Sequence, residues 1–185
     1  MKAKRIKTVG IILAALFVIE ICFDPISLIS LKKQNERAEK NLPIAIKKWH
    51  SSGIEDYSID VEGGIAMVCL YSNRITVRDG ILYNVEVRQD LFDNTSPFIT
   101  VPVEEWNSFC RYNELTIPSI FDKIEKALNN HNNMAKIIVS FNDSYGYVTE
   151  FIYQCNVRNG ILDPKLSDCG FGFHFSNFRV INNID

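Results

Sequence analysis

Hydrophobic and polar residues follow three different patterns along the chain. Residues 8–23 form an apolar run that only Glu20 interrupts. Residues 57–62 alternate between apolar and polar side chains, which is typical of a half-buried strand. Residues 117–128 carry apolar side chains at helical spacing. These patterns predict a membrane segment followed by a body of helices and strands.

The strongest local pattern in the body is ITVRDGILYNVEV, residues 75–87, where Asp79 and Gly80 separate two alternating runs. Asp-Gly in this setting predicts a two-residue hairpin loop. Residues 89–114 lose periodicity and predict a long connection, which is a common place for function. The other expected elements are helices at residues 32–50 and 117–129, the second capped by Thr116, and strands at residues 57–62, 66–71, 136–141, 147–155 and 171–181.

This order of elements predicts an α+β fold, with an N-terminal membrane helix followed by a two-layer domain of helices packed on a mainly antiparallel sheet. VRDGIL at residues 77–82 is echoed by VRNGIL at residues 157–162, about 80 residues later. Two α-β-β-β halves would explain this echo. The alternative explanation is that hairpins repeatedly select Asp-Gly or Asn-Gly between β-forming residues.

The first 31 residues predict attachment to a membrane. Four positive charges in MKAKRIK precede the apolar run, and such charges favour a cytoplasmic tail. No A-x-A-like cleavage site follows Ala15, which favours a retained anchor over a removed signal peptide. We therefore expect residues 32–185 to form one domain outside the cytoplasm, in the periplasm or the extracellular space.

Four cysteines follow the apolar run. An even number is compatible with two disulfides in an oxidising compartment, and Cys155 and Cys169 are the expected pair because they bracket a turn-rich loop. Four buried free thiols are the alternative. No C-x-x-C or Cys/His cluster has the spacing of metal ligands, so no metal site is predicted.

The charge of the chain argues against nucleic acid as a partner. The formal net charge is −2, and no window after Lys48 gathers lysine and arginine. A surface that binds phosphates needs such a cluster.

Candidate functional residues are few. The chain has no G-x-S-x-G, P-loop, H-E-x-x-H or dinucleotide motif, and its three histidines are far apart in sequence. We therefore predict no catalytic residue and no cofactor. Trp106 in the long connection, and Tyr145 and Tyr147 near the Asn-Asp-Ser-Tyr-Gly turn, are candidate binding residues. The alternative is an ordinary role in the core or in a turn.

Several features occur in a fixed order: Trp49, Tyr57, the VRDGIL turn, the helix IFDKIEKAL and the segment FNDSYGYVTEFIY. In these features the chain resembles an uncharacterised family of small bacterial envelope proteins. The resemblance covers roughly residues 45–180. It implies a secreted or membrane-attached α+β domain and implies no activity.

The expected function is binding without catalysis. The tethered domain would bind another protein or a small ligand through its sheet face or through residues 89–114. One alternative is an envelope enzyme of hydrolytic type that uses Asp143, His174 or Asp79. A pocket that joins a carboxylate to a histidine would favour that enzyme. The other alternative is a small structural subunit of a membrane complex, in which Glu20 would contact a partner helix.

Overall fold

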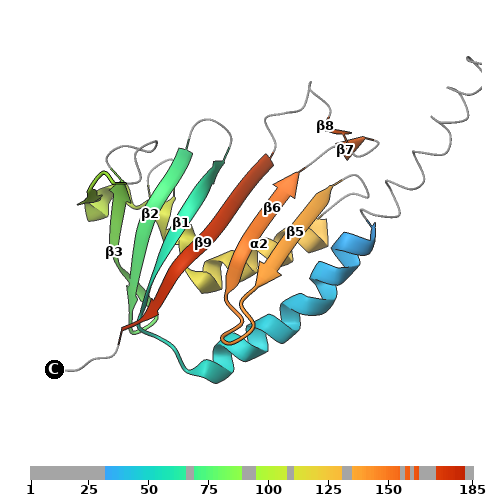
Figure 1. Ribbon diagram of the computed structural model, residues 1–185, viewed down its shortest axis with the longest axis horizontal. Helices are drawn as coiled ribbons and strands as arrows, with labels where there is room; N and C mark the ends of the chain where they lie inside the picture. The colour runs from blue at the N-terminus through green and yellow to red at the C-terminus, as the bar shows by residue number, and fades with distance from the viewer. Residues whose placement is uncertain are drawn as a thin grey trace, which may run out of the picture.

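A computed structural model of the chain describes residues 32–65, 69–88, 95–107, 111–130, 135–154, 157–158, 161–162 and 170–181. Its largest element is a seven-stranded antiparallel sheet in the order β4-β3-β2-β1-β9-β6-β5 (Figure 1). The strands are β1 (Tyr57–Ile65), β2 (Cys69–Arg78), β3 (Ile81–Arg88), β4 (Phe98–Thr100), β5 (Lys136–Phe141), β6 (Val148–Gln154) and β9 (Gly170–Val180). A separate two-stranded sheet pairs β7 (Val157–Arg158) with β8 (Ile161–Leu162).

The hairpin between β2 and β3 forms where the sequence predicts it. Asp79 and Gly80 have φ angles of 50° and 72°, and positive φ at both central residues is the requirement of a type I′ turn. The Asp79 N–H also donates to Asp56 Oδ1 at 2.7 Å. The hairpin prediction is therefore confirmed.

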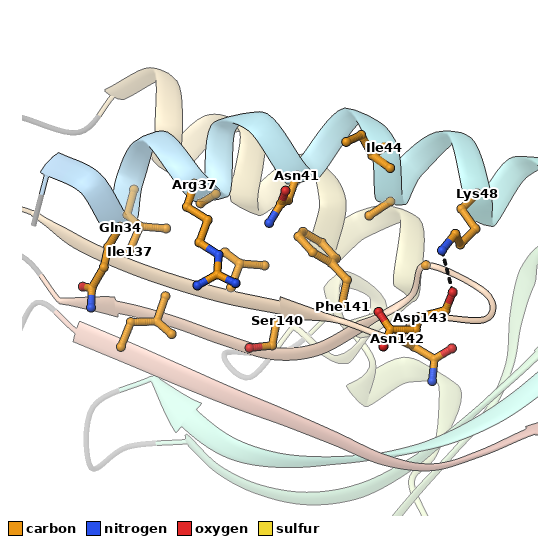
Figure 2. A pocket seen from close by; sticks show the side chains of 15 residues that line it. Gln34, Arg37, Asn41, Ile44, Lys48, Ile137, Ser140, Phe141, Asn142 and Asp143 are labelled. Atoms are coloured by element: carbon orange, nitrogen blue, oxygen red, sulfur yellow. Dashed lines mark hydrogen bonds between the residues drawn. The ribbon is translucent and has the colours of Figure 1, made fainter.

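Both α-helices in the described part of the chain pack on the same face of the sheet (Figures 1 and 2). The N-terminal helix covers residues 32–52 and continues through Pro43. It buries one stripe of side chains, namely Ala38, Leu42, Ala45 and Trp49. The other helix, α2 (Ile117–Asn130), buries Ile117, Ile120, Phe121, Ile124 and Leu128. The inward-facing residues of the strands complete a single hydrophobic core.

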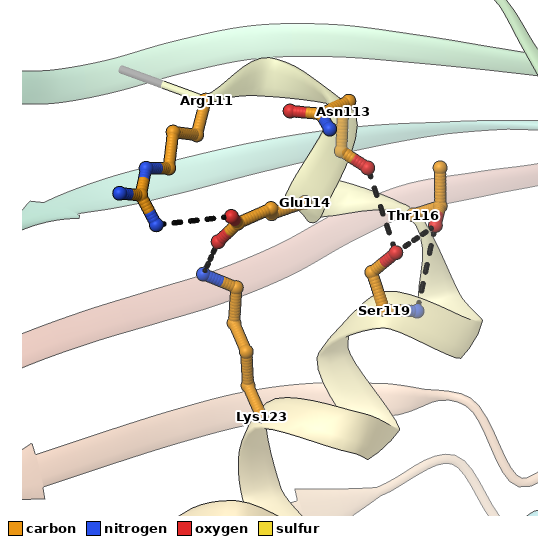
Figure 3. Close-up of polar contacts among 6 residues, drawn as sticks. All are labelled: Arg111, Asn113, Glu114, Thr116, Ser119 and Lys123. Carbon is orange, nitrogen blue, oxygen red and sulfur yellow. Dashed lines mark hydrogen bonds and ion pairs between the residues drawn. The ribbon is translucent and has the colours of Figure 1, made fainter. Parts of the chain in front are cut away.

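Helix α2 begins with two hydrogen bonds from its first turn. The predicted cap, Thr116, accepts from the backbone N–H of Ser119 through Oγ1 at 3.4 Å (Figure 3). The Tyr57 hydroxyl of β1 accepts from the backbone N–H of Ile117 at 3.0 Å. Burial raises the pKa of the Tyr57 phenol. The helix is therefore joined to the central strand at its first residue.

Strand β9 returns from the end of the chain to lie between β1 and β6. At Gly63 of β1 the two backbones approach closely. Gly63 has a φ of 132°, and a Cβ atom there would lie 1.9 Å from the carbonyl oxygen of Gly172. Only glycine fits both this backbone conformation and this space.

Strand β4 forms the far edge of the sheet, opposite β5. It has three residues and lies between Pro97 and Pro102. The Phe98 ring is in contact with two guanidinium groups, that of Arg74 at 4.4 Å and that of Arg88 at 4.6 Å. These cation–π contacts stabilise the packing of β4 against β2, which carries Arg74, and β3, which carries Arg88. Two 3-10 helices, η1 (Val103–Glu105) and η2 (Tyr112–Leu115), follow in the predicted long connection.

A cluster of charges joins η2 to α2 (Figure 3). Glu114 accepts hydrogen bonds from Lys123 Nζ at 2.5 Å and from Arg111 Nη1 at 3.2 Å. The hydrogen bond from Lys123 is the main reason that the pKa of Glu114 lies below its usual value of 4.5. Ionised Glu114 therefore stabilises the folded chain.

This cluster predicts a change in stability with pH. A carboxyl group with a lowered pKa stabilises the fold above its unfolded pKa and loses that contribution as the pH falls through its folded pKa. We expect Glu114→Gln to cost about 0.5 kcal/mol at pH 6, because the group is partly exposed, and less as the pH falls below about 4. Urea unfolding across this range measures the cost. Glu125→Gln, an exposed position on α2, should cost little at any pH. A cost for Glu114→Gln that stays constant down to pH 3 would contradict the assignment.

The predicted fold class is wrong. The sequence pattern predicted an N-terminal membrane helix ahead of a two-layer domain. The structure is instead mostly a seven-stranded antiparallel sheet with two α-helices in the described residues. None of the helices within those residues has the length and apolar character needed to cross a membrane. The apolar run on which the prediction relied, residues 8–23, lies outside the described residues.

The two α-β-β-β halves are part of this error. VRDGIL forms the turn between β2 and β3 in the large sheet, whereas the matching VRNGIL contributes β7 and β8 to the separate small sheet. The third strand of the large sheet in the second half is β9, which comes later in the chain. The two similar segments, VRDGIL and VRNGIL, thus occupy different places in the fold. A similar turn sequence does not determine which sheet a hairpin joins.

Candidate functional site

A groove of about 530 Å³ lies between the N-terminal helix and β5 (Figure 2). We call it the helix–β5 groove. Its helix side is lined by Gln34, Arg37, Asn41, Ile44 and Lys48. Its strand side is lined chiefly by Ile137, Val139, Phe141, Asn142 and Asp143. The helix stripe that lines the groove lies beside the stripe that is buried in the core, because side chains three and four residues apart share a face.

Asn35 holds the helix against one end of the groove. Its side chain is buried, with 5% of its surface exposed. Its Nδ2 donates to the carbonyl of Ala135 at 3.0 Å, and its Oδ1 accepts from the N–H of Ile137 at 3.1 Å. The carboxamide thereby takes the place of one peptide group of a neighbouring strand.

The hairpin between β5 and β6 closes the other end of the groove. Gly146 has a φ of 81°, and a Cβ atom there would lie 2.4 Å from the carbonyl oxygen of Ala45. The backbones of helix and hairpin are therefore in contact. Lys48 Nζ also donates to the carbonyl of Asp143 (Figure 2). The groove is thus held open between two fixed ends.

The groove is polar and carries one available positive charge. Amide side chains from Gln34, Asn41 and Asn142 line it, and Ile44 lies at its rim with 57% of its surface exposed. Figure 2 shows the Arg37 side chain extending from the helix toward β5. Within the described residues Arg37 makes no ion pair. An occupant of the groove could therefore place an anionic group against it.

The face of the sheet opposite the helices offers a less suitable surface. Asp60, which is nearly buried, accepts from Arg74 Nε at 2.8 Å and Nη2 at 3.2 Å, and from Asn177 Nδ2 at 2.9 Å. The hydrogen bond to Asp60 is the main reason that the pKa of Arg74 is raised. A cavity of about 340 Å³ beside Arg74 and Arg179 is smaller than the groove. The Asp60 carboxylate and the Arg74 guanidinium of this face are therefore already paired with each other.

The predicted binding residues lie at opposite ends of the fold. Trp106 follows η1 on the β4 side, where its Nε1 donates to the carbonyl of Val101 at 3.0 Å. Tyr145 and Tyr147 lie together beside Phe178, with ring centroids 5.7 and 4.4 Å from its ring. Burial raises the pKa of Tyr147, whereas Tyr145 is 40% exposed. Their role in binding stays a prediction. Cys155 and Cys169, the predicted disulfide, lie outside the described residues.

The residues named for the hydrolytic alternative are not brought together. Asp143 lines the groove from an exposed turn, and Asp79 lies in the exposed turn between β2 and β3. His174 is exposed on β9, opposite Glu62 and Glu150 on the face away from the helices. The described lining of the groove includes no histidine that could activate Ser140 or act with Asp143.

Sequence reasoning missed the helix side of the groove. One signal was present, since Asn35 continues the buried helical stripe of Ala38, Leu42, Ala45 and Trp49 at the same spacing of three and four residues. A polar residue in such a stripe is expected to have a specific hydrogen-bond partner. The sequence did not reveal that the partner is the backbone of β5.

A model for a family of unknown function (DUF6174) matches residues 41–154, more than half of the chain. The matched range includes the strand side of the groove and begins after Arg37 on the helix side. No curated protein and no solved structure matches the chain.

Proposed function

The chain belongs to a family of unknown function (DUF6174), and we propose that it is a binding protein that recognises another protein through the helix–β5 groove. The expected resemblance to an uncharacterised family is thereby confirmed. A bacterial origin and an envelope location are part of our proposal. The basic tail and the apolar run within residues 1–31 support a tether to a membrane, with the domain outside the cytoplasm.

The observation that carries this proposal is the construction of the groove. Its volume of about 530 Å³ lies in the usual range of binding sites, about 300–1,000 Å³. Buried hydrogen bonds from Asn35 fix one end, and the contact between Gly146 and Ala45 fixes the other. A site with fixed walls loses little conformational entropy when it binds. The groove is lined by side-chain amides, one available arginine and an exposed isoleucine. These polar, charged and apolar groups suit contact with the surface of a peptide.

Catalysis is less well supported than binding. Hydrolysis needs a nucleophile, or a water molecule, next to a general base. In the described lining, Ser140 and Asp143 come without a histidine. An exposed carboxylate in a turn is also ordinary turn chemistry. Binding therefore accounts for the groove with fewer assumptions.

Site-specific cross-linking tests the proposal. A photoreactive amino acid at Ile44, on the rim of the groove, should give a discrete adduct with one partner in intact cells. The matched control is the same amino acid at Tyr83, which is 68% exposed on β3, away from the groove. Mass spectrometry identifies the partner, and protease added outside the cytoplasmic membrane should degrade the adduct. The same adducts from both positions, or none from Ile44, would refute recognition through the groove.

A further inference from the structure

An edge of the large sheet borders the helix–β5 groove and carries no further strand among the described residues. Strand β5 pairs with β6 and is the last strand in the sheet order. The N–H of Ile137 bonds Asn35 rather than β6. In an antiparallel pair, successive residues turn their N–H and C=O groups alternately toward and away from the partner strand. Val139 and Phe141 therefore direct their N–H groups away from β6 as well.

These outward groups have no partner in the described part of the chain. The Asn142 N–H donates to the carbonyl of Tyr147 at 2.8 Å and therefore points inward. The alternation along β5 thus continues past the shift in register with β6 between Ser140 and Phe141. The C=O groups of Ile137 and Val139 and the N–H groups of Val139 and Phe141 remain for an occupant. The Asn35 side chain makes the first hydrogen bonds along this edge of β5. The backbone of an occupant would continue the same ladder of hydrogen bonds.

The dimensions of the edge suit a short extended segment. Four residue steps from Ile137 to Phe141 cover about 13 Å at about 3.3 Å per residue. The helix forms the other wall of the groove (Figure 2). A second copy of the chain is a poorer occupant, because its own β5 carries its own helix.

The charges indicate which segment fits. Arg37 lines the groove within one turn of Asn35, whereas Asp143 lines the hairpin end. Lys48 already donates to the backbone of Asp143. An acidic side chain is favoured near Arg37 and disfavoured near Asp143. Backbone pairing would supply affinity, and this charge would supply selectivity.

We propose that β5 accepts an extended segment of about four residues from a partner protein as an eighth strand, with an acidic side chain of the segment against Arg37. This inference rests on the proposed function, since it specifies what the groove binds. The outward backbone groups of β5 and Arg37, which makes no ion pair among the described residues, together carry it.

Hydrogen exchange of the full chain in detergent micelles tests whether the edge is free. The N–H groups of Ile138 and Ser140 face β6 and should exchange slowly. The N–H of Val139 should exchange at least about tenfold faster. Equal protection of Val139 and Ile138 would overturn the proposal, because the edge would already be covered. Protection of Val139 that rises with protein concentration would also overturn it, because the occupant would then be a second copy.

A defined peptide tests the occupant. The probe is acetyl-Thr-Val-Glu-Val-Thr-amide, and the comparison peptide has lysine in place of glutamate. We expect the glutamate peptide to slow exchange at Val139 and Phe141 and to bind about threefold more tightly than the lysine peptide. Arg37→Glu should reverse this preference. Lys47→Glu makes the same change in charge at an exposed position of the same helix outside the groove, and should preserve the preference.

The results separate this inference from the proposed function. If neither peptide slows exchange at millimolar concentration, the added strand is refuted. If Arg37→Glu has no more effect than Lys47→Glu, the contact between Arg37 and an acidic side chain is refuted. A specific adduct from Ile44 would then still support recognition of another protein through the groove. The partner would bind there through a surface that is not an added strand. Loss of that adduct as well would refute both.

Discussion

Replacing Gly63 by alanine is expected to lower the free energy of unfolding by about 4 kcal/mol. Two costs add at this position. The φ of 132° is strained for any residue with a Cβ atom, and that atom would lie 1.9 Å from the carbonyl oxygen of Gly172. The neighbour is backbone and belongs to β9, so it cannot move aside as a flexible side chain would. Urea unfolding, followed by tryptophan fluorescence, measures the loss.

Gly80→Ala is the matched control for this prediction. Gly80 also has a positive φ, 72°, but a Cβ atom there would meet nothing within 4 Å. Gly80→Ala should therefore lower the free energy of unfolding by only about 1 kcal/mol, which is the cost of the backbone strain alone. Equal costs at Gly63 and Gly80 would show that β1 and β9 do not approach as closely as described.

Replacing Asn35 by leucine is expected to cost about 3 kcal/mol. The substitution keeps the number and branching of the side-chain heavy atoms but removes both hydrogen bonds to β5. The carbonyl of Ala135 and the N–H of Ile137 would then be left beside an apolar group. An unpaired buried polar group costs about 1–3 kcal/mol, so two of them outweigh the gain in apolar burial. Urea unfolding again gives the magnitude.

Asn41→Leu makes the same chemical change on the same helix and serves as the control. Asn41 lines the groove, and its side chain makes no hydrogen bond among the described residues. It should change the stability by less than about 0.5 kcal/mol. If both substitutions cost the same, the helix is not held to β5 through Asn35.

The local elements of the fold could be predicted from the sequence. The Asp79-Gly80 turn requires positive φ at two adjacent residues, and the sequence supplies residues that tolerate it. The apolar stripe from Ile117 to Leu128 predicted α2, and its buried positions match that stripe. Each of these signals lies within a few residues. Local chemistry is therefore sufficient to reveal them.

The arrangement of the sheet could not be predicted in this way. The pairing of β1 with β9 joins residues more than 100 positions apart, such as Gly63 and Phe173. No local pattern specifies that partner. VRDGIL and VRNGIL belong to different sheets for the same reason. The neighbouring strands, and not the sequence of the turn, determine which sheet a hairpin joins.

The candidate site shows the same division. Asn35 and Arg37 belong to a helix that the sequence predicted, but their importance depends on β5 lying beside that helix as the last strand of the sheet. Trp106, Tyr145 and Tyr147 were selected because aromatic side chains often bind ligands. In the structure each of them makes a contact within the chain, Trp106 with the carbonyl of Val101 and the two tyrosines with the Phe178 ring.

The short strand β4 has a consequence for self-association. Edge-to-edge polymerisation needs two open edges on each molecule, one to add to and one to offer. The β4 edge has only three residues, is bounded by Pro97 and Pro102, and has Phe98 fastened between two arginines. Among the described strands only β5 presents a usable edge of the large sheet, so pairing through it would end at two molecules. The sheet can thus offer one edge for recognition without seeding fibrils.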